Sequence, residues 1–423
     1  MPKIVILGLG AAGFGAALAA KKQDRKAEIT IIDEKDFDLM HQCGLPFALE
    51  GRIKDFSGLK HSISADRMGM KLLNNCKISS IDLDKKTVHY TKENEDKKIG
   101  YERLIIATGS KPFIPPIKTS NRIFAVHDLK TTKELDKNIK KGQKAIIIGA
   151  GAIGLETAVA LNKKGMEVKV IDLLDSTFPK AIDKDISSIL EEKLKEKGIK
   201  LELGKKADEI KEDAVVVAAA GVKPNIDFLE KDNIKVNKFG LVVNKSMETS
   251  VKDVYAAGDC CCVSSLISNK EMPSQLANNA YKQGTAAGAN AAGGNKSYNG
   301  ILNAFVSLID DIEIAAVGFN SSLAGHFMIK AITGKAKGKH LPEWFGPSEE
   351  LTVKLIADEK GRVIGAQAIG KGAKERINII SAAIKAGLTL KEVADLELAY
   401  CPALSDYYDV LVMAAELGLR KIR

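Results

Sequence analysis

Two segments of this 423-residue chain repeat one pattern, an apolar stretch, a glycine turn and a stretch of small residues. The pattern predicts a β-strand, a tight turn and a helix whose N-terminus can hold a phosphate group. One such turn can arise by chance, but two copies in equivalent contexts indicate two dinucleotide-binding sites. The glycines are Gly8, Gly10 and Gly13 in the first copy and Gly149, Gly151 and Gly154 in the second.

An acidic residue ends the second expected strand of each copy. Asp33, followed by Glu34, ends the first copy, and Asp172 ends the second. A carboxylate at this place accepts hydrogen bonds from the hydroxyl groups of a ribose. At the second site it would also repel a 2′-phosphate, so Asp172 favours NADH, although nearby Lys169 points the other way and leaves NADPH possible.

The composition argues against several other functions. Apolar residues form 45% of the chain and charged residues 28%, which is typical of a folded protein of two or three domains. The formal charge is +9, but lysine and glutamate are interleaved and aromatic residues form only 5%, too few to stack on bases. No apolar run reaches the roughly 18 residues of a membrane span. We therefore expect a cytoplasmic protein without a nucleic-acid or membrane partner.

The six cysteines do not form the pattern of a disulfide framework, and no Cys-x-x-Cys pair suggests a metal site. Three of them, Cys260, Cys261 and Cys262, are consecutive, and neighbouring side chains point in different directions. They cannot share one tetrahedral metal centre, so we expect them to pack as small residues. Cys76 has no partner in its surroundings and is expected in the core.

Cys43 stands in the segment HQCGLPFALEG, where Pro46 favours the first turn of a helix. A thiol near a helix N-terminus has a lowered pKa and is a better nucleophile as its thiolate. The alternative is a small thiol packed in the core, the usual fate of a lone cysteine. His41 can act as an acid-base group for this thiol or simply point to solvent.

Four further segments resemble the pyridine nucleotide-disulfide oxidoreductase family. They contain Thr108-Gly109, Gly221, Gly258-Asp259 and a helix that begins ANNAYKQG. The family's two-cysteine members carry a second cysteine five residues after the first, but this chain has Ala48 there. The chain is therefore similar to the single-cysteine branch, which contains coenzyme A-disulfide reductases, NADH oxidases and NADH peroxidases.

The resemblance implies an α/β fold with two Rossmann-like dinucleotide-binding domains and a C-terminal α+β dimerisation domain. Residues 1–112 and 245–320 would bind FAD, residues 113–244 would bind NAD(P)H, and residues 321–423 would form the interface of a homodimer. The residues implied at the FAD site include Thr108, Gly109, Gly258 and Asp259, the last near the ribityl chain. Those implied at the NAD(P)H site include Ile153, Glu156 and Gly221, with Glu156 near the nicotinamide.

A lone thiol facing a flavin supports two chemistries. It can attack a disulfide or polysulfide, or it can pass through sulfenic acid and reduce peroxide or oxygen. By the resemblance, oxidases and peroxidases carry a histidine within the first glycine turn, where this chain has Ala11 and Ala12. Disulfide reduction is therefore favoured, with coenzyme A disulfide among the candidate substrates. A non-thiol electron-transfer flavoprotein reductase, in which Cys43 is incidental, is a second alternative.

The segment around Tyr400 resembles the part of the family that reaches the partner subunit's active site. Tyr400 matches a tyrosine whose hydroxyl assists the substrate thiolate, whereas Cys401 stands where relatives have alanine or histidine. Cys401 either acts as a second thiol opposite Cys43 or fills the space of an alanine. A second aromatic hydroxyl expected from the resemblance is replaced by Trp344 and Phe345, so the acceptor itself stays open.

Overall fold

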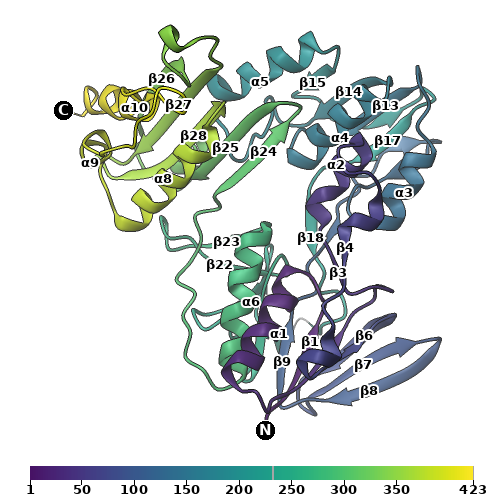
Figure 1. The fold of residues 1–423 in the computed structure, drawn as a ribbon. Helices are drawn as coiled ribbons and strands as arrows, with labels where there is room; N and C mark the ends of the chain where they lie inside the picture. The colour runs from purple at the N-terminus through teal and green to yellow at the C-terminus, as the bar shows by residue number, and fades with distance from the viewer. Residues whose placement is uncertain (231–232, 423) are drawn as a thin grey trace. The chain divides into compact units, whose positions relative to one another are not determined.

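The structure, a computed structural model, describes residues 1–230 and 233–422. Its contacts divide the chain into two compact units, which are drawn together in Figure 1 and considered separately here. The first unit consists of Met1–Leu45, Lys54–Phe113 and Val222–Ile301. The second consists of Pro46–Ile53, Ile114–Gly221 and Leu302–Arg423.

The first unit is built on a five-stranded parallel sheet in the order β21-β9-β1-β2-β5. Its central strand is the apolar stretch before the first glycine turn, and Ile4, Ile6 and Leu7 are at most 1% exposed. A strand covered on both faces needs no polar alternation, which explains the continuous apolar run. The strands are β1 (Lys3–Leu7), β2 (Glu28–Ile32), β5 (Met70–Leu73), β9 (Arg103–Ile106) and β21 (Val254–Ala256).

Two helices of this unit, α1 (Ala11–Gln23) and α6 (Ala277–Ala291), lie side by side in Figure 1. Their backbones approach closely because a Cβ atom at Gly284 would lie only 2.0 Å from the carbonyl oxygen of Ala12. Gly288, one turn later, has the same relation to Ala16. The small residues of both helices are therefore required by this packing.

Short, mostly antiparallel strands complete the first unit. One sheet contains β6 (Cys76–Asp82), β7 (Thr87–Lys92) and β8 (Glu95–Gly100), and another contains β19 (Val236–Asn237), β20 (Gly240–Val242), β22 (Cys261–Ser264) and β23 (Glu271–Pro273). Two-stranded pairs are β3 (Leu39–Met40) with β4 (Lys60–His61) and β10 (Ser110–Pro112) with β18 (Val222–Pro224). Short 3₁₀ turns cover Gln42–Gly44, Phe56–Leu59 and Ala65–Met68.

The second unit contains its own five-stranded parallel sheet, in the order β12-β17-β13-β14-β15. Its central strand again precedes a glycine turn, so the repeated sequence pattern has produced a repeated local fold. The strands are β12 (Ile123–Phe124), β13 (Lys144–Ile148), β14 (Glu167–Asp172), β15 (Lys200–Leu203) and β17 (Val215–Ala218). The helices are α3 (Leu129–Lys137), α4 (Ala152–Lys163) and α5 (Lys184–Glu196), and a further strand pair is β11 (Lys118–Thr119) with β16 (Glu209–Ile210).

The C-terminal part of the second unit is an antiparallel sheet in the order β24-β25-β28-β27-β26, covered by helices. Arg376 of α8 pairs with the buried Asp409, which also caps the N-terminus of α10. The strands are β24 (Phe305–Ile309), β25 (Ile312–Gly318), β26 (Ile332–Lys339), β27 (Glu350–Ala357) and β28 (Val363–Gly370). The helices are α7 (Ser321–His326), α8 (Ala373–Ala386), α9 (Leu390–Ala394) and α10 (Val410–Leu419), with a 3₁₀ turn at Glu343–Phe345.

The predicted α/β class with two Rossmann-like parts and a C-terminal α+β part is confirmed. The division into three domains stays a prediction, and the two units draw their boundaries elsewhere. Residues 222–244, expected with the NAD(P)H domain, lie in the first unit, whereas residues 302–320, expected with the FAD domain, lie in the second. The short segment Pro46–Ile53 also belongs to the second unit, although the chain on both sides of it belongs to the first.

Within residues 1–230 and 233–422, the helices are all too short or too polar to cross a membrane.

Candidate functional site

The two glycine turns have the same backbone geometry. The N–H of Gly8 donates to the carbonyl of Ile32 at 2.8 Å, and the N–H of Gly149 donates to the carbonyl of Ile171 at 2.8 Å. Both glycines have positive φ, +95° and +115°, a region that residues with side chains rarely adopt. The repeat read from the sequence is therefore a structural repeat as well.

The third glycine of each turn is required by close packing. A Cβ atom at Gly13 would lie 1.9 Å from the carbonyl oxygen of Gly8, and one at Gly154 would lie 2.0 Å from that of Gly149. The middle glycines, Gly10 and Gly151, have open space around them and begin α1 and α4 without any side-chain cap. The first N–H groups of both helices are thus available to an anion such as a pyrophosphate.

Asp33 is placed by the first glycine turn. Its carboxylate accepts hydrogen bonds from the N–H of Leu9 and, at 2.8 Å, from the N–H of Lys35. The Lys35 ammonium group lies 2.6 Å from the same carboxylate. Asp33 is only 4% exposed, while Glu34 is exposed. The acid therefore braces the turn, and its role toward a ribose stays a prediction.

Asp172 repeats this arrangement in the second unit. Its carboxylate accepts the N–H of Ala150 at 2.7 Å and the N–H of Leu174 at 2.8 Å. Lys169, which the sequence left as a contact for a 2′-phosphate, instead pairs with Glu212 at 2.7 Å. A fixed negative charge at the ribose position and an occupied lysine both favour NADH over NADPH.

The residues expected around the flavin lie within the first unit. Ser110 donates to the Asp259 carboxylate at 2.9 Å, and the buried Gln283 accepts the N–H of Gly258 at 2.8 Å. Thr108 donates to a main-chain carbonyl rather than to a side chain. Ser110 was not identified from the sequence, although it directly follows the Thr108-Gly109 pair. Gly109 and Gly258 have positive φ, +68° and +84°. Gly221, expected at the NAD(P)H site, lies in the second unit and has a φ of +105°.

Ala12 and Ile153 occupy equivalent places in their glycine turns but have different surroundings. Ala12 is 5% exposed and packs under helix α6, whereas Ile153 is 41% exposed at the start of α4. Because α6 covers Ala12 so closely, this side of the first turn leaves no space for a larger side chain.

Cys43 lies in the 3₁₀ turn Gln42–Gly44, which leads directly into the six-residue helix α2 (Leu45–Glu50). Pro46 is the second residue of this helix, in agreement with the predicted helix start. Cys43 is exposed in the structure, so the alternative that its thiol packs in the core is wrong. His41 is also exposed, as expected from the solvent-facing alternative.

Tyr400 and Cys401 lie in an irregular segment of the second unit. Tyr400 is 46% exposed and its ring meets Tyr407 edge to face at 6.2 Å between centroids. Cys401 is exposed, and its carbonyl accepts two main-chain N–H groups of the following turn. Cys43 belongs to the first unit, so an active site that contains Cys43 together with Tyr400 or Cys401 stays a prediction.

The three consecutive cysteines are buried, and each sulfur contacts a different carbonyl. Cys260, Cys261 and Cys262 reach the main-chain oxygens of Ile106, Gly258 and Leu241, respectively. Cys76 is fully buried, as expected of a core residue. Among the described residues, no group of three or more His, Cys, Asp or Glu side chains is arranged to hold a metal ion.

Glu156 is a partly buried acid that follows the second glycine turn on α4. Its carboxyl accepts a hydrogen bond from the hydroxyl of Ser307, on β24, at 2.7 Å. Burial raises the pKa of Glu156 to about 7, and the nearby Glu50 carboxylate acts in the same direction. Glu156 was expected at the site from the sequence, whereas Ser307, which comes from a distant part of the chain, was not.

The raised pKa predicts pH-dependent stability. Because the folded-state pKa of Glu156, about 7, exceeds its ordinary value of 4.5, its stabilising contribution is complete below pH 4.5 and is lost as the pH rises through 7. The expected loss is at most roughly 3 kcal/mol. Glu156→Gln, which cannot ionise, should therefore become progressively more stable than the parent protein between pH 5 and about 8. Thermal unfolding midpoints measured across this range test the prediction, and parallel pH profiles would contradict it.

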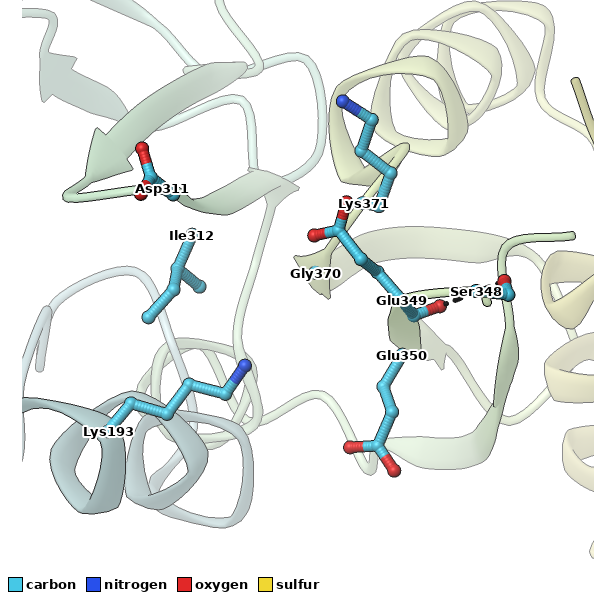
Figure 2. A pocket seen from close by; sticks show the side chains of 8 residues that line it. All are labelled: Lys193, Asp311, Ile312, Ser348, Glu349, Glu350, Gly370 and Lys371. Atoms are coloured by element: carbon cyan, nitrogen blue, oxygen red, sulfur yellow. Dashed lines mark hydrogen bonds between the residues drawn. The ribbon is translucent and has the colours of Figure 1, made fainter. Parts of the chain in front are cut away.

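A cavity of about 240 Å³ lies in the second unit, and its lining includes none of the candidate site residues described above. Figure 2 shows that two lysines and three acids approach it from several elements. Its lining residues are Lys193, Asp311, Ile312, Ser348, Glu349, Glu350, Gly370 and Lys371. This mixture of charges selects no particular ligand chemistry, and the sequence analysis named none of these residues.

Comparison with known proteins identifies similarity along the whole chain. A protein-family model described as pyridine nucleotide-disulphide oxidoreductase matches residues 2–284. A second model, described as the dimerisation domain of the same proteins, matches residues 306–411. Both matches agree with the regions in which the corresponding folds are observed.

Curated relatives and solved structures extend this similarity. A protein named NADH oxidase from Methanocaldococcus jannaschii is 31% identical, with 99% of each chain covered. A protein named NAD(P)H sulfur oxidoreductase (CoA-dependent) from Pyrococcus furiosus is 29% identical, with 98% of each chain covered. The structure of an NAD-dependent persulfide reductase from A. fulgidus superposes with a TM-score of 0.94 at 28% identity, covering 99% of this chain and 83% of that one.

Proposed function

The chain belongs to the pyridine nucleotide-disulphide oxidoreductase family, and we propose that it is an FAD-dependent enzyme that uses NADH to reduce a sulfur–sulfur bond in a small molecule. The observation that carries this proposal is the exposed thiol of Cys43 in the turn just before helix α2, in a chain with two complete glycine turns. Relatives named as sulfur and persulfide reductases support a sulfur acceptor.

The residues of the first unit fit FAD. The free N–H groups at the start of α1 and the open space at Gly10 suit its pyrophosphate, and Asp33 suits its ribose. Ser110 orients the Asp259 carboxylate, which would bind the ribityl chain. When bound, FAD accepts a hydride from NADH and supplies two electrons to sulfur. Asp172 and the turn at Gly151 would hold the NADH.

Cys43 is the proposed nucleophile. Its thiolate attacks one sulfur of the acceptor, the sulfur–sulfur bond breaks, and the first thiolate leaves. The mixed disulfide on Cys43 then takes up two electrons and one proton, which restores the Cys43 thiolate and releases the second thiol. His41, which is exposed beside this turn, is available to supply the proton.

The match of residues 306–411 to a dimerisation domain supports a homodimer. In that dimer we expect Tyr400 of one subunit to assist the departing thiolate at the partner subunit's site. Cys401 either adds a second thiol there or only fills space. Coenzyme A disulfide is a candidate acceptor because coenzyme A appears in the names of relatives from Pyrococcus furiosus and Pyrococcus horikoshii.

Oxygen or peroxide reduction is the second candidate, supported by the relative named NADH oxidase from M. jannaschii. Against it, Ala11 and Ala12 provide no acid-base group in the first glycine turn, and α6 covers Ala12 closely. An electron-transfer reductase without a thiol step is a weaker alternative because it leaves the exposed Cys43 unused.

The acceptor decides between these functions. We expect NADH consumption with coenzyme A disulfide, another low-molecular-weight disulfide or polysulfide to exceed that with oxygen or peroxide by at least about tenfold in kcat/KM. NADH consumption is measured with each acceptor separately under anaerobic conditions. Oxygen is supplied only in the assay in which it is the acceptor. Fastest turnover with oxygen or peroxide would replace the proposal by the oxidase or peroxidase function.

A further inference from the structure

Asp310 is an acid that collects basic groups from several parts of the second unit. It occupies the tight turn between β24 and β25, where Ile309 and Ile312 are paired. Its φ of +57° is a backbone conformation that aspartate tolerates better than most residues. The side chain is 5% exposed, so its charge is almost entirely removed from water.

Two lysines satisfy the Asp310 carboxylate. Lys163, at the end of α4, lies 2.5 Å from it, and Lys197, directly after α5, contacts its other oxygen. Burial alone would raise the pKa of Asp310, but the hydrogen bonds from both lysines outweigh it and lower that pKa. Asp310 therefore remains ionised, and a buried charge of this kind is tolerated only while its partners stay in place.

The same acid holds the end of the helix that follows Cys43. Arg52 donates to the main-chain carbonyl of Asp310 at 2.7 Å and to the Glu50 carboxylate at 2.8 Å. Glu50, the last residue of α2, is 7% exposed and also lies 2.6 Å from Lys163. The Arg52 guanidinium also lies 3.9 Å from the Asp310 carboxylate, which closes a ring of charges with Glu50 and Lys163.

Helix α2 depends on contacts with other elements for its stability. It has six residues, and a helix of that length is not stable by itself in water. Its segment, Pro46–Ile53, packs with the second unit while the chain before and after it packs with the first. The charge ring at the C-terminal end of α2 therefore helps to hold this short helix within the second unit, and the Cys43 turn is joined directly to its N-terminal end.

We propose that Asp310 is a positioning residue for the sulfur chemistry, because it fixes the end of helix α2 and thereby orients the Cys43 turn. This inference rests on the proposed function of Cys43. The Asp310 carboxylate acts on the helix through Lys163, at 2.5 Å, and through Arg52, at 3.9 Å.

The test is the holoenzyme carrying Asp310→Asn, which keeps the size of the side chain and removes its charge. The N–H groups of Arg52 and Ile53, both bonded to the carbonyl of Phe47, report on the end of α2. We expect hydrogen exchange in residues 45–53 to accelerate at least about tenfold. We also expect kcat/KM for the acceptor to fall about tenfold, while flavin reduction by NADH changes little.

A matched control is Asp183→Asn. Asp183 is a half-buried acid of the second unit that accepts a hydrogen bond from Ser321 at 2.7 Å and lies 2.8 Å from the Lys354 ammonium group. Its substitution should lower the unfolding temperature but leave exchange in residues 45–53 unchanged. Equal acceleration in both variants would show general loosening and overturn the inference.

Arg52→Gln breaks the ring from the other side and should reproduce the effect of Asp310→Asn. In the double variant the two effects should not add, because both act on one link. Additive effects, or unchanged exchange in Asp310→Asn, would contradict the inference. The exchange measurement needs no acceptor, so a failure of the proposed sulfur chemistry would be recognised separately by the acceptor comparison.

Discussion

Cys43→Ser is expected to lower turnover with a disulfide acceptor by at least about a thousandfold. A serine hydroxyl is not ionised near neutral pH and cannot form a mixed disulfide, so the first bond exchange is lost. NADH should still reduce the flavin of this variant, because the dinucleotide turns are untouched. Rapid-mixing absorbance measurements separate the two half-reactions, and steady-state NADH consumption measures the loss.

A spectroscopic signature accompanies this prediction. A thiolate close to an oxidised flavin produces a long-wavelength charge-transfer band, which should be present in the parent enzyme and absent in Cys43→Ser. Cys401→Ser is the matched control. If Cys401 only fills space, this variant should keep both the turnover with disulfide and the charge-transfer band. Full disulfide turnover in Cys43→Ser would remove the thiol from the mechanism, and a loss in Cys401→Ser would instead establish a second thiol.

Gly13→Ala is expected to abolish stable FAD binding. The added Cβ atom would lie 1.9 Å from the carbonyl oxygen of Gly8, so α1 or the turn must shift by more than an ångström. The pyrophosphate of FAD would bind the backbone N–H groups at the start of α1. A shift of the turn would displace all of these groups together, so their hydrogen bonds to the pyrophosphate would be lost. We expect the FAD content of the purified protein to fall at least about tenfold, measured by flavin absorbance against protein concentration.

Two substitutions control for a general effect of alanine. Gly154→Ala makes the equivalent clash, 2.0 Å from the Gly149 carbonyl, and should weaken NADH binding while FAD is retained. Gly325, on α7, has open space and an ordinary φ, so Gly325→Ala should change neither. Stoichiometric FAD in Gly13→Ala would show that the first turn is not the flavin site.

Local features of the sequence carried most of the predicted site. Both glycine turns, the acids Asp33 and Asp172 and the helix start after Cys43 depend on residues close together in the chain, where spacing alone determines geometry. The resemblance to a known family added the expectation that Thr108 and Asp259 contact FAD, which no local pattern indicates and which remains a prediction. The roles of Tyr400 and Cys401 remain predictions.

Contacts between distant residues were decided only by the tertiary structure. Ser110 and Asp259 are 149 residues apart, Glu156 and Ser307 are 151 apart, and Arg52 and Asp310 are 258 apart. Hydrophobic periodicity and turn spacing say which face of an element is buried, but not which side chain of another element meets it. The sequence by itself therefore determined the two dinucleotide turns and the placement of Cys43 before a helix. Folding determined which charges hold that helix, because Arg52, Lys163 and Asp310 come from separate elements that only the packed fold brings together.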